Sequence, residues 1–295
     1  MLVAADATWQ VRSVPALETL CAFGDAVWAM GAPFTLLCFS GGTITGIAVP
    51  FASADRLVVH PSGTLWAVGR DALWESVDGI RWARLPLAIP LAPPWSDLAF
   101  APDGQFWMVA TNDARMVHRN TDGSITIIPL PKDDPHDHAE HVLFVDRQSI
   151  VWYQNGPVGL WRRQHDTWER MPFAPDPATP GSYGMHIYAM VEDAQGYLWA
   201  GTDQGIARYD GTAWHSVLPV LHPPSGDLLL EMPLLRSGFS ALAIDAAGVV
   251  WCGGANYHHL LAIDTTSQPY PVDDDAVTVG IDVPALQIID AADWQ

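Results

Sequence analysis

The chain has 295 residues and a formal net charge of −19, because 33 Asp and Glu stand against 14 Lys and Arg. Nucleic acids and anionic membranes are disfavoured as partners, since both carry negative charge themselves. With 49% hydrophobic residues the chain is too apolar to be disordered, and its 24 Gly and 24 Pro are typical of short strands joined by turns.

Six copies of one pattern follow each other along the chain. In each copy a short apolar run is followed by a turn and by a second apolar run that contains a Trp. The six Trp residues are Trp28, Trp66, Trp107, Trp152, Trp199 and Trp251. Successive members lie 38 to 52 residues apart, a period that predicts an array of small sheets. We expect the Trp side chains of the last five copies to be buried between these sheets.

Four short strands are expected in each copy. In the second copy they lie near Leu57–His60, Leu65–Gly69, Leu73–Ser76 and Arg81–Leu85. The fourth copy has DRQS where a Gly turn is usual, and its third hairpin is expected to turn at His165-Asp166. In the fifth copy the strands are expected at Tyr188–Glu192, Tyr197–Gly201, Ile206–Tyr209 and Ala213–Leu218. Asp210-Gly211 is a strong hairpin signal before the last of them.

The two ends of the chain resemble parts of a further copy. Val279–Ile289 aligns with the first two strands of the sixth copy, and the N-terminal segment aligns with a third and a fourth strand. We therefore predict an all-β propeller of seven four-stranded blades that forms one domain over residues 1–295. Residues 1–15 and 276–295 would together form the closing blade, so that no sheet edge stays exposed. The alternative is a six-bladed ring with one terminal segment as an extra strand.

Two short motifs resemble known propeller repeats. EDAQGYLWAGTDQGIARYDGTAWHSV, in the fifth copy, resembles the two-component regulator propeller repeat, whose pattern is D-x-x-G-x-L-W-x-G-T-x-x-G-I-x-x-Y-D. SVDGIRW (Ser76–Trp82) resembles the Asp-box turn of sialidase-like propellers. In the sensor family these repeats form a periplasmic ligand-sensing region ahead of a membrane helix and a kinase. The sequence shows neither of these and no signal peptide, so we expect the fold to carry over and not the sensing role.

The long segments of the chain lie between the copies. They are Pro86–Ser96, Lys132–Glu140, Pro172–His186 and Pro219–Gly238. The geometry of a blade places them on one face, where function is expected. Loop aromatics such as Trp95, Tyr183 and Tyr257 are expected to be exposed contact residues. The candidate binding residues of this face are Trp95, His136, His138, His141, Tyr183, His186, His222, Glu231, Tyr257 and His258.

One loop, KDDPHDHAEH (132–141), carries the residue types of a zinc site. His136, His138 and His141 lie among four carboxylates, and imidazole and carboxylate groups both bind zinc. The spacing H-x-H-x-x-H matches no standard zinc site, however, and acidic loops are common on surfaces. We therefore expect no metal and no cofactor.

No catalytic motif stands out, since the sequence contains no G-x-S-x-G, no Walker loop and no H-E-x-x-H. Streptogramin-lyase-type propellers use a His and acidic residues around a central metal. By resemblance to them, His186 or His222 would be the His, and Glu231 would be an acidic residue of such a site. We expect instead a non-catalytic protein of the acidic inhibitor, immunity or scaffold type, with no catalytic residues. The alternative is a propeller enzyme of lyase or hydrolase type with its site at the central opening.

Expectations about partner and location follow from charge and cysteine content. The partner of such an acidic protein is expected to be another protein, plausibly a basic one, and the chain is expected to be a monomer without it. Three cysteines, an odd number within strand-like runs, favour buried thiols in a reducing compartment. Together with the lack of a signal peptide, they predict a cytoplasmic location.

Overall fold

The computed structural model describes the inner part of the chain in sixteen stretches. They are residues 17–31, 35–40, 43–51, 54, 56–69, 72–86, 88–90, 94–111, 113–131, 141–155, 159–171, 186–202, 205–216, 239–253, 259–264 and 286–290. The ordered elements within these stretches are 24 β-strands. None of the described residues belongs to a helix that could cross a membrane.

The strands form six antiparallel sheets, each made of four strands that are consecutive in the chain. We number the sheets 1 to 6 in chain order. Sheets 1 and 2 contain β1 (Leu17–Phe23), β2 (Ala26–Gly31), β3 (Thr35–Ser40), β4 (Thr43–Ile47), β5 (Arg56–His60), β6 (Thr64–Val68), β7 (Leu73–Ser76) and β8 (Trp82–Arg84). Sheets 3 and 4 contain β9 (Trp95–Phe100), β10 (Phe106–Ala110), β11 (Arg115–Arg119), β12 (Ile125–Pro129), β13 (His141–Val145), β14 (Val151–Asn155), β15 (Leu160–Gln164) and β16 (Thr167–Met171).

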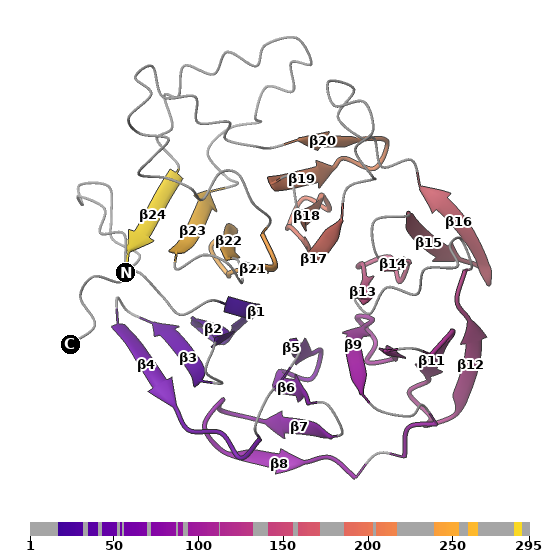
Figure 1. The fold of residues 1–295 in the computed structure, drawn as a ribbon, viewed down its shortest axis with the longest axis horizontal. Helices are drawn as coiled ribbons and strands as arrows, with labels where there is room; N and C mark the ends of the chain where they lie inside the picture. Colours follow the sequence, from indigo (N-terminus) through magenta and orange to yellow (C-terminus); the bar gives the residue numbers. More distant parts are fainter. Residues whose placement is uncertain are drawn as a thin grey trace.

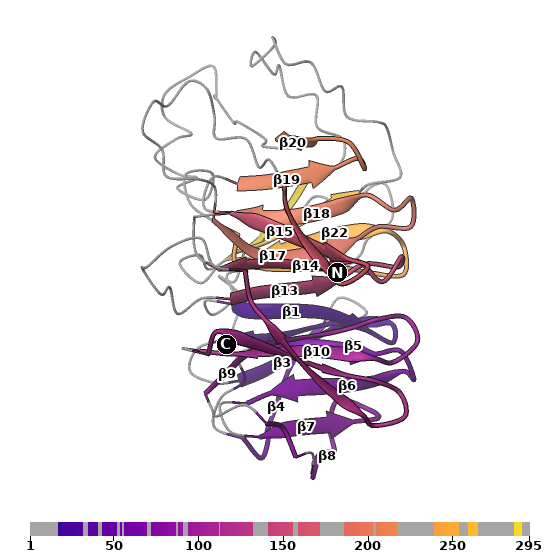
Figure 2. The same ribbon diagram turned by 90° about the vertical axis from the view of Figure 1, so that its right-hand side faces the viewer.

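The last two sheets follow the same plan. Sheets 5 and 6 contain β17 (Ile187–Glu192), β18 (Leu198–Thr202), β19 (Gly205–Tyr209), β20 (Trp214–Ser216), β21 (Ala241–Ile244), β22 (Val249–Gly253), β23 (His259–Asp264) and β24 (Leu286–Asp290). Figure 1 shows the six sheets arranged around a common centre, with the first strand of each sheet innermost and the fourth outermost. In the edge-on view of Figure 2 the strands run along the short axis of this disc. The predicted all-β propeller architecture is confirmed.

The predicted seventh blade is wrong, because the described strands make six four-stranded sheets. The C-terminal segment was expected to supply two strands of that blade, yet β24 pairs with β23 and is the fourth strand of sheet 6. Among the described strands, sheet 6 has three before this segment, and β24 supplies the fourth by pairing with the edge of β23. Residues 1–16 and 276–285 lie outside the described residues, so the predicted pairing between the two ends is not among the strand pairs of the structure.

In sheets 4, 5 and 6 the repeat has a chemical basis in one carboxylate. In sheet 5, Asp193 Oδ1 accepts hydrogen bonds from the backbone N–H groups of Gln195, at 3.0 Å, and Tyr197, at 2.9 Å. Its Oδ2 accepts a hydrogen bond from the Trp199 indole at 2.8 Å. A single side chain therefore fixes the turn and orients the Trp. Asp146 with Trp152 and Asp245 with Trp251 repeat this arrangement in sheets 4 and 6.

The oriented Trp side chains pack between neighbouring sheets. Each lies in an apolar cluster with a Leu or Met from the first strand of the next sheet; for example, Trp199 shares a cluster with Leu242. Trp251 of sheet 6 likewise shares one with Leu20 of sheet 1. The predicted burial is confirmed, since Trp66, Trp107, Trp152, Trp199 and Trp251 are at most 7% exposed.

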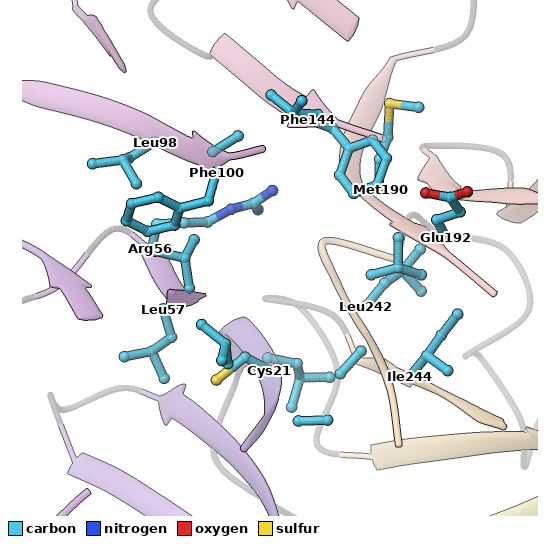
Figure 3. Close-up of a pocket in the computed structure, with 18 of the residues that line it drawn as sticks. Cys21, Arg56, Leu57, Leu98, Phe100, Phe144, Met190, Glu192, Leu242 and Ile244 are labelled. Atoms are coloured by element: carbon cyan, nitrogen blue, oxygen red, sulfur yellow. The ribbon is translucent and has the colours of Figure 1, made fainter. Parts of the chain in front are cut away.

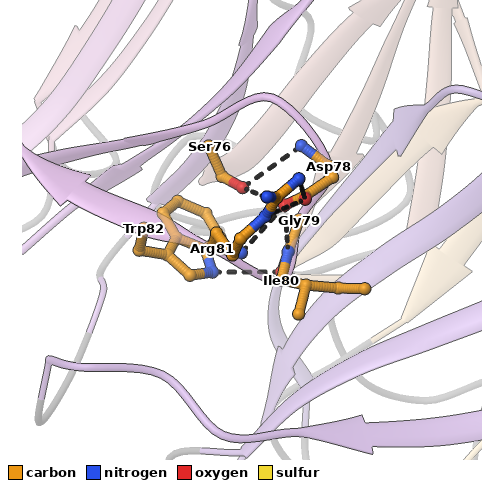
Figure 4. A network of polar contacts seen from close by, with 6 residues as sticks. All are labelled: Ser76, Asp78, Gly79, Ile80, Arg81 and Trp82. Atoms are coloured by element: carbon orange, nitrogen blue, oxygen red, sulfur yellow. Dashed lines mark hydrogen bonds and ion pairs between the residues drawn. The ribbon is translucent and has the colours of Figure 1, made fainter.

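The Asp-box turn of sheet 2 is held by its own side chains (Figure 4). Asp78 Oδ1 accepts hydrogen bonds from the backbone N–H groups of Ile80, at 3.0 Å, and Arg81, at 2.8 Å. These bonds hold the pKa of Asp78 well below its usual range, the Arg81 backbone contributing most. Gly79 between them has a φ of 73°, and a Cβ there would overlap the ring of Trp28. The turn therefore serves the packing of sheets 1 and 2.

Candidate functional site

A cavity of about 300 Å³ lies at the centre of the ring (Figure 3). The first strands of all six sheets contribute to its wall, because these strands are innermost. The lining residues are Leu20, Cys21, Ala22, Arg56, Leu57, Val58, Val59, Leu98, Ala99, Phe100, Leu143, Phe144, Val145, Met190, Val191, Glu192, Leu242, Ala243 and Ile244. Two of them, Arg56 and Glu192, carry charged side chains, and the other side chains are apolar or, at Cys21, a thiol.

Glu192 is the last residue of β17 and is fixed by the neighbouring sheet. Its Oε2 accepts a hydrogen bond of 2.7 Å from the backbone N–H of Arg147, in the turn between β13 and β14. Burial raises the pKa of Glu192, the Arg147 N–H opposes this, and the nearby Asp146 and Asp193 raise it further. Within the described part of the chain, Oε1 makes no hydrogen bond. The site therefore holds a carboxyl that is anchored through one oxygen and whose pKa lies above that of an ordinary glutamate.

Arg56 lies at the start of β5, and Figure 3 shows its guanidinium directed into the cavity. Its Nε lies 3.1 Å from Oδ1 of Asp97, a carboxylate that is 2% exposed. Asp97 also accepts hydrogen bonds of 2.8 Å from the backbone N–H groups of Leu98 and Leu143. Asp97 thus joins sheets 2, 3 and 4, while the charge of Arg56 is already balanced before any ligand binds.

The strand register gives the separation of the two groups along the ring axis. Val58 pairs with Trp66 and Val191 pairs with Trp199, so Val58 and Val191 lie at equivalent levels. Arg56 lies two residues before this level and Glu192 one residue after it. At about 3.3 Å per residue, their backbones are about 10 Å apart along the axis. The long Arg56 side chain and the carboxyl of Glu192 therefore approach the same cavity from different levels.

The thiol in the cavity wall is not a nucleophile. Burial raises the pKa of Cys21 far above its usual range, with a smaller opposing effect from Arg56. A thiolate is the reactive form of cysteine, so this side chain is inert at neutral pH. All three cysteines are free, and Cys21 and Cys252 are buried as expected, whereas Cys38 is half-buried.

Three of the predicted binding residues lie among the described residues. Trp95 does not lie in a loop as expected but begins β9, and it is 8% exposed because it packs in the apolar cluster between sheets 2 and 3. His141 begins β13 and is buried, with Nδ1 2.9 Å from the hydroxyl of Tyr153. His186 directly precedes β17 and stacks on Tyr188, with ring centroids 4.5 Å apart.

The other predicted site residues lie outside the described residues. They are His136, His138, Tyr183, His222, Glu231, Tyr257 and His258. The described stretches contain no group of three metal-binding side chains. The expectation that the loop of residues 132–141 binds no metal therefore stays a prediction.

Sequence reasoning missed Glu192 and Arg56. Aligning the six copies on their Trp residues would have shown the signal at Glu192, because the other copies have an apolar residue at that position. These residues, each seven positions before its Trp, are Cys21, Val59, Phe100, Val145 and Ile244. A charge in a strand that is otherwise apolar and central is unusual, and it marks a candidate site.

Comparisons with known proteins agree with the architecture. The family model described as "Two component regulator propeller" matches residues 184–204, and no curated protein matches the sequence. A catalytically inactive virginiamycin B lyase from Staphylococcus aureus with quinupristin is 14% identical, covers 97% of this chain and 89% of its own, and has a TM-score of 0.56. A gluconolactonase from Xanthomonas campestris is 16% identical, covers 84% of this chain and 86% of its own, and has a TM-score of 0.60. The calcium-binding protein regucalcin from Agrobacterium tumefaciens is 16% identical, covers 96% of this chain and 93% of its own, and has a TM-score of 0.54.

These similar structures correct one expectation. A lyase and a gluconolactonase favour the enzyme alternative and contradict the main expectation of a non-catalytic binding protein. At 14–16% identity the likeness shows the fold alone and establishes no activity. Residues 184–204 match a two-component regulator propeller repeat, and the chain has the fold of a β-propeller.

Proposed function

We propose that this protein is an enzyme of lyase or hydrolase type that acts on a small molecule in the central cavity. Glu192 would be its general acid–base. The observation that carries the proposal is a single half-buried carboxyl in an apolar wall, anchored through Oε2 by the Arg147 N–H. Carboxyls in apolar surroundings, whose pKa is raised toward neutrality, are the usual acid–base groups of enzymes.

The two reaction types share their first requirement. In a lyase reaction Glu192 would take a proton from the carbon next to a carbonyl, and the electron pair would expel the leaving group. In a hydrolase reaction it would take a proton from a water molecule that attacks the carbonyl. In both, negative charge develops on the carbonyl oxygen, and the N–H groups of Arg56 on the other side of the cavity would stabilise it. Glu192 would then return the proton to the leaving group.

The site also requires that the six sheets form a closed six-bladed ring, which we propose as part of this function. Two contacts between sheets 6 and 1 support closure. Leu20 packs with Trp251 and Ala243, and the Ser240 hydroxyl donates a hydrogen bond of 3.3 Å to the carbonyl of Leu17. Closure by side-chain packing would give the cavity a continuous wall without the strand pairing expected from the sequence.

A substrate screen with two matched variants tests the proposal. The purified protein is assayed with aryl esters, lactones and elimination substrates, first as the wild type. Glu192→Gln should lower kcat/KM by about 100-fold or more, since a general acid–base contributes a factor of this size. Glu169→Gln is the control, because Glu169 makes its ion pair with Arg162 on the outer strands. Equal activity of both variants, or no turnover of any substrate, would refute the role of Glu192.

The pH profile gives a second readout. Glu192 accepts a proton only in its ionised form, and its pKa lies above the ordinary value for the reasons given above. Activity should therefore fall with decreasing pH through a midpoint above about 4.3, the value of an unperturbed glutamate. A midpoint at or below that value would assign the acid limb to another group.

A further inference from the structure

The charges around the cavity constrain what it can bind. Arg56 and Asp97 form a pair 3.1 Å apart and cancel each other, which leaves Glu192 as the unbalanced charge among the described side chains of the lining. The protein as a whole carries −19. A carboxylate that enters the cavity would therefore meet net repulsion, which comes from Glu192.

The wall supplies the remaining recognition. The lining includes the apolar residues Phe100, Phe144, Met190, Leu98 and Leu242, which Figure 3 labels. These side chains would bind the apolar part of a ligand, because both lose water-accessible apolar surface on binding. The volume of about 300 Å³ fits a small molecule of one ring or one short chain. The guanidinium of Arg56 still offers N–H groups beyond the Nε that faces Asp97, and these suit an uncharged acceptor such as a carbonyl oxygen.

We propose that the central cavity selects uncharged, largely apolar carbonyl compounds and discriminates against the corresponding carboxylates, with Glu192 as the residue that excludes the anions. The inference rests on the proposed function in taking the same cavity as the binding site, and it concerns equilibrium binding alone. For the proposed enzyme it has a consequence, because a hydrolytic product that carries a carboxylate would be released readily.

The test uses three ligands with the same phenyl-ethyl body and different charge. Benzylacetone is a neutral ketone that cannot be hydrolysed, hydrocinnamate is its isosteric carboxylate, and phenylpropylamine is a cation. Binding of each ligand to the full-length protein is measured directly by isothermal titration calorimetry at pH 8. We expect benzylacetone to bind at least about tenfold more tightly than hydrocinnamate.

The Glu192→Gln variant then assigns the selectivity. It should bind hydrocinnamate about tenfold more tightly than the wild type does while its affinity for benzylacetone stays the same, because the substitution removes a charge and keeps the shape. Glu169→Gln should reproduce the wild-type affinities, which excludes a general effect of net charge. Circular dichroism checks that both variants are folded.

Defined results would overturn the inference. They are equal or tighter binding of hydrocinnamate than of benzylacetone by the wild type, tightest binding of phenylpropylamine, or an unchanged ratio in Glu192→Gln. Failure of the proposed function looks different. If the protein shows the selectivity but turns over no substrate, the proposed enzymatic function is refuted and the binding inference stands. Turnover of carboxylate substrates would support the enzymatic function and refute the binding inference.

Discussion

Sheets 3 and 5 share one plan but differ at the residue before the first turn. In sheet 5 this residue is Asp193, whose carboxylate accepts the Trp199 indole N–H at 2.8 Å. In sheet 3 it is Ala101, and the indole nitrogen of Trp107 is buried with no hydrogen-bond partner among the described residues. The backbone turn is nevertheless the same, since Ala101 N–H bonds to the carbonyl of Gln105 as Asp193 N–H bonds to that of Tyr197.

The difference separates two roles of the Asp, fixing the turn and orienting the Trp, which a single carboxylate combines in sheet 5. The turn forms from backbone hydrogen bonds and a Gly of positive φ, and it needs no carboxylate. Orientation of the Trp can come from other contacts, because the ring of Trp107 stacks on His118 with centroids 4.2 Å apart. The Asp therefore adds stability to a geometry that the turn and the packing already define.

The largest effect is expected from removing the Trp wedges themselves. Trp199→Ala and Trp107→Ala should each lower the free energy of unfolding by about 3–5 kcal/mol, because each leaves a cavity between two sheets. Trp199→Ala should be the more damaging of the two, since it also leaves the buried carboxylate of Asp193 without its indole partner. Guanidinium denaturation followed by circular dichroism measures both, and the opposite order would refute the role given to Asp193.

The next effect concerns the carboxylate alone. Asp193→Ala removes the acceptor of three N–H groups around a residue that is 1% exposed, so we expect a loss of about 2–3 kcal/mol. The control is Asp103→Ala in the turn of sheet 3, where the carboxylate is exposed and bonds to Gln105. That substitution should cost about 0.5 kcal/mol or less. Similar losses in the two variants would show that the buried carboxylate of Asp193 stabilises the protein no more than the exposed carboxylate of Asp103 does.

The architecture was predictable because the repeat signals are local. An apolar run, a turn and a Trp specify two strands and a wedge, and strands of sheets 2 and 5 fall within one or two residues of their predicted bounds. The number of sheets was not predictable, because it depends on which strand the C-terminal segment joins. Alignment of that segment with the start of sheet 6 could not show that β24 instead pairs with β23.

The candidate site was harder to predict than the fold. Long loops drew attention to their own residues, and Trp95 looked exposed because Pro93 and Pro94 precede it. In the structure β9 begins directly at Trp95. The cavity depends on which side chains the inner strands bring together from six separate sheets, and no spacing along the chain encodes this. Only the position of Glu192 among apolar equivalents carried a signal.

A smaller effect would convert sheet 3 toward sheet 5. Ala101→Asp should place a carboxylate next to Trp107 Nε1 and raise the free energy of unfolding by about 1 kcal/mol, the net worth of one hydrogen bond. The same substitution in a Trp107→Phe background should give no gain, because phenylalanine has no N–H to donate. A gain of equal size in both backgrounds would mean that the stabilisation has another source, which the double-mutant cycle would reveal.

The smallest effect lies in the turn of sheet 4, which departs from the repeat at a different residue. Ser149 has a φ of 62°, whereas Gly104, Gly196 and Gly248 occupy this position in sheets 3, 5 and 6 with φ of 83–89°. Because a side chain is strained in this region and glycine is not, Ser149→Gly should stabilise the protein by about 0.5–1 kcal/mol.

The reciprocal change, Gly196→Ser, should cost a similar amount in the same denaturation experiment. The turn of Ser149 also presents the Arg147 N–H to Glu192 at 2.7 Å, so relief of its strain has a further expected readout. If the strain affects only the stability of the turn, Ser149→Gly should leave the acid midpoint of the pH profile unchanged. A midpoint shifted upward, as a weaker Arg147 hydrogen bond would cause, would show that the strained turn helps to position the carboxyl.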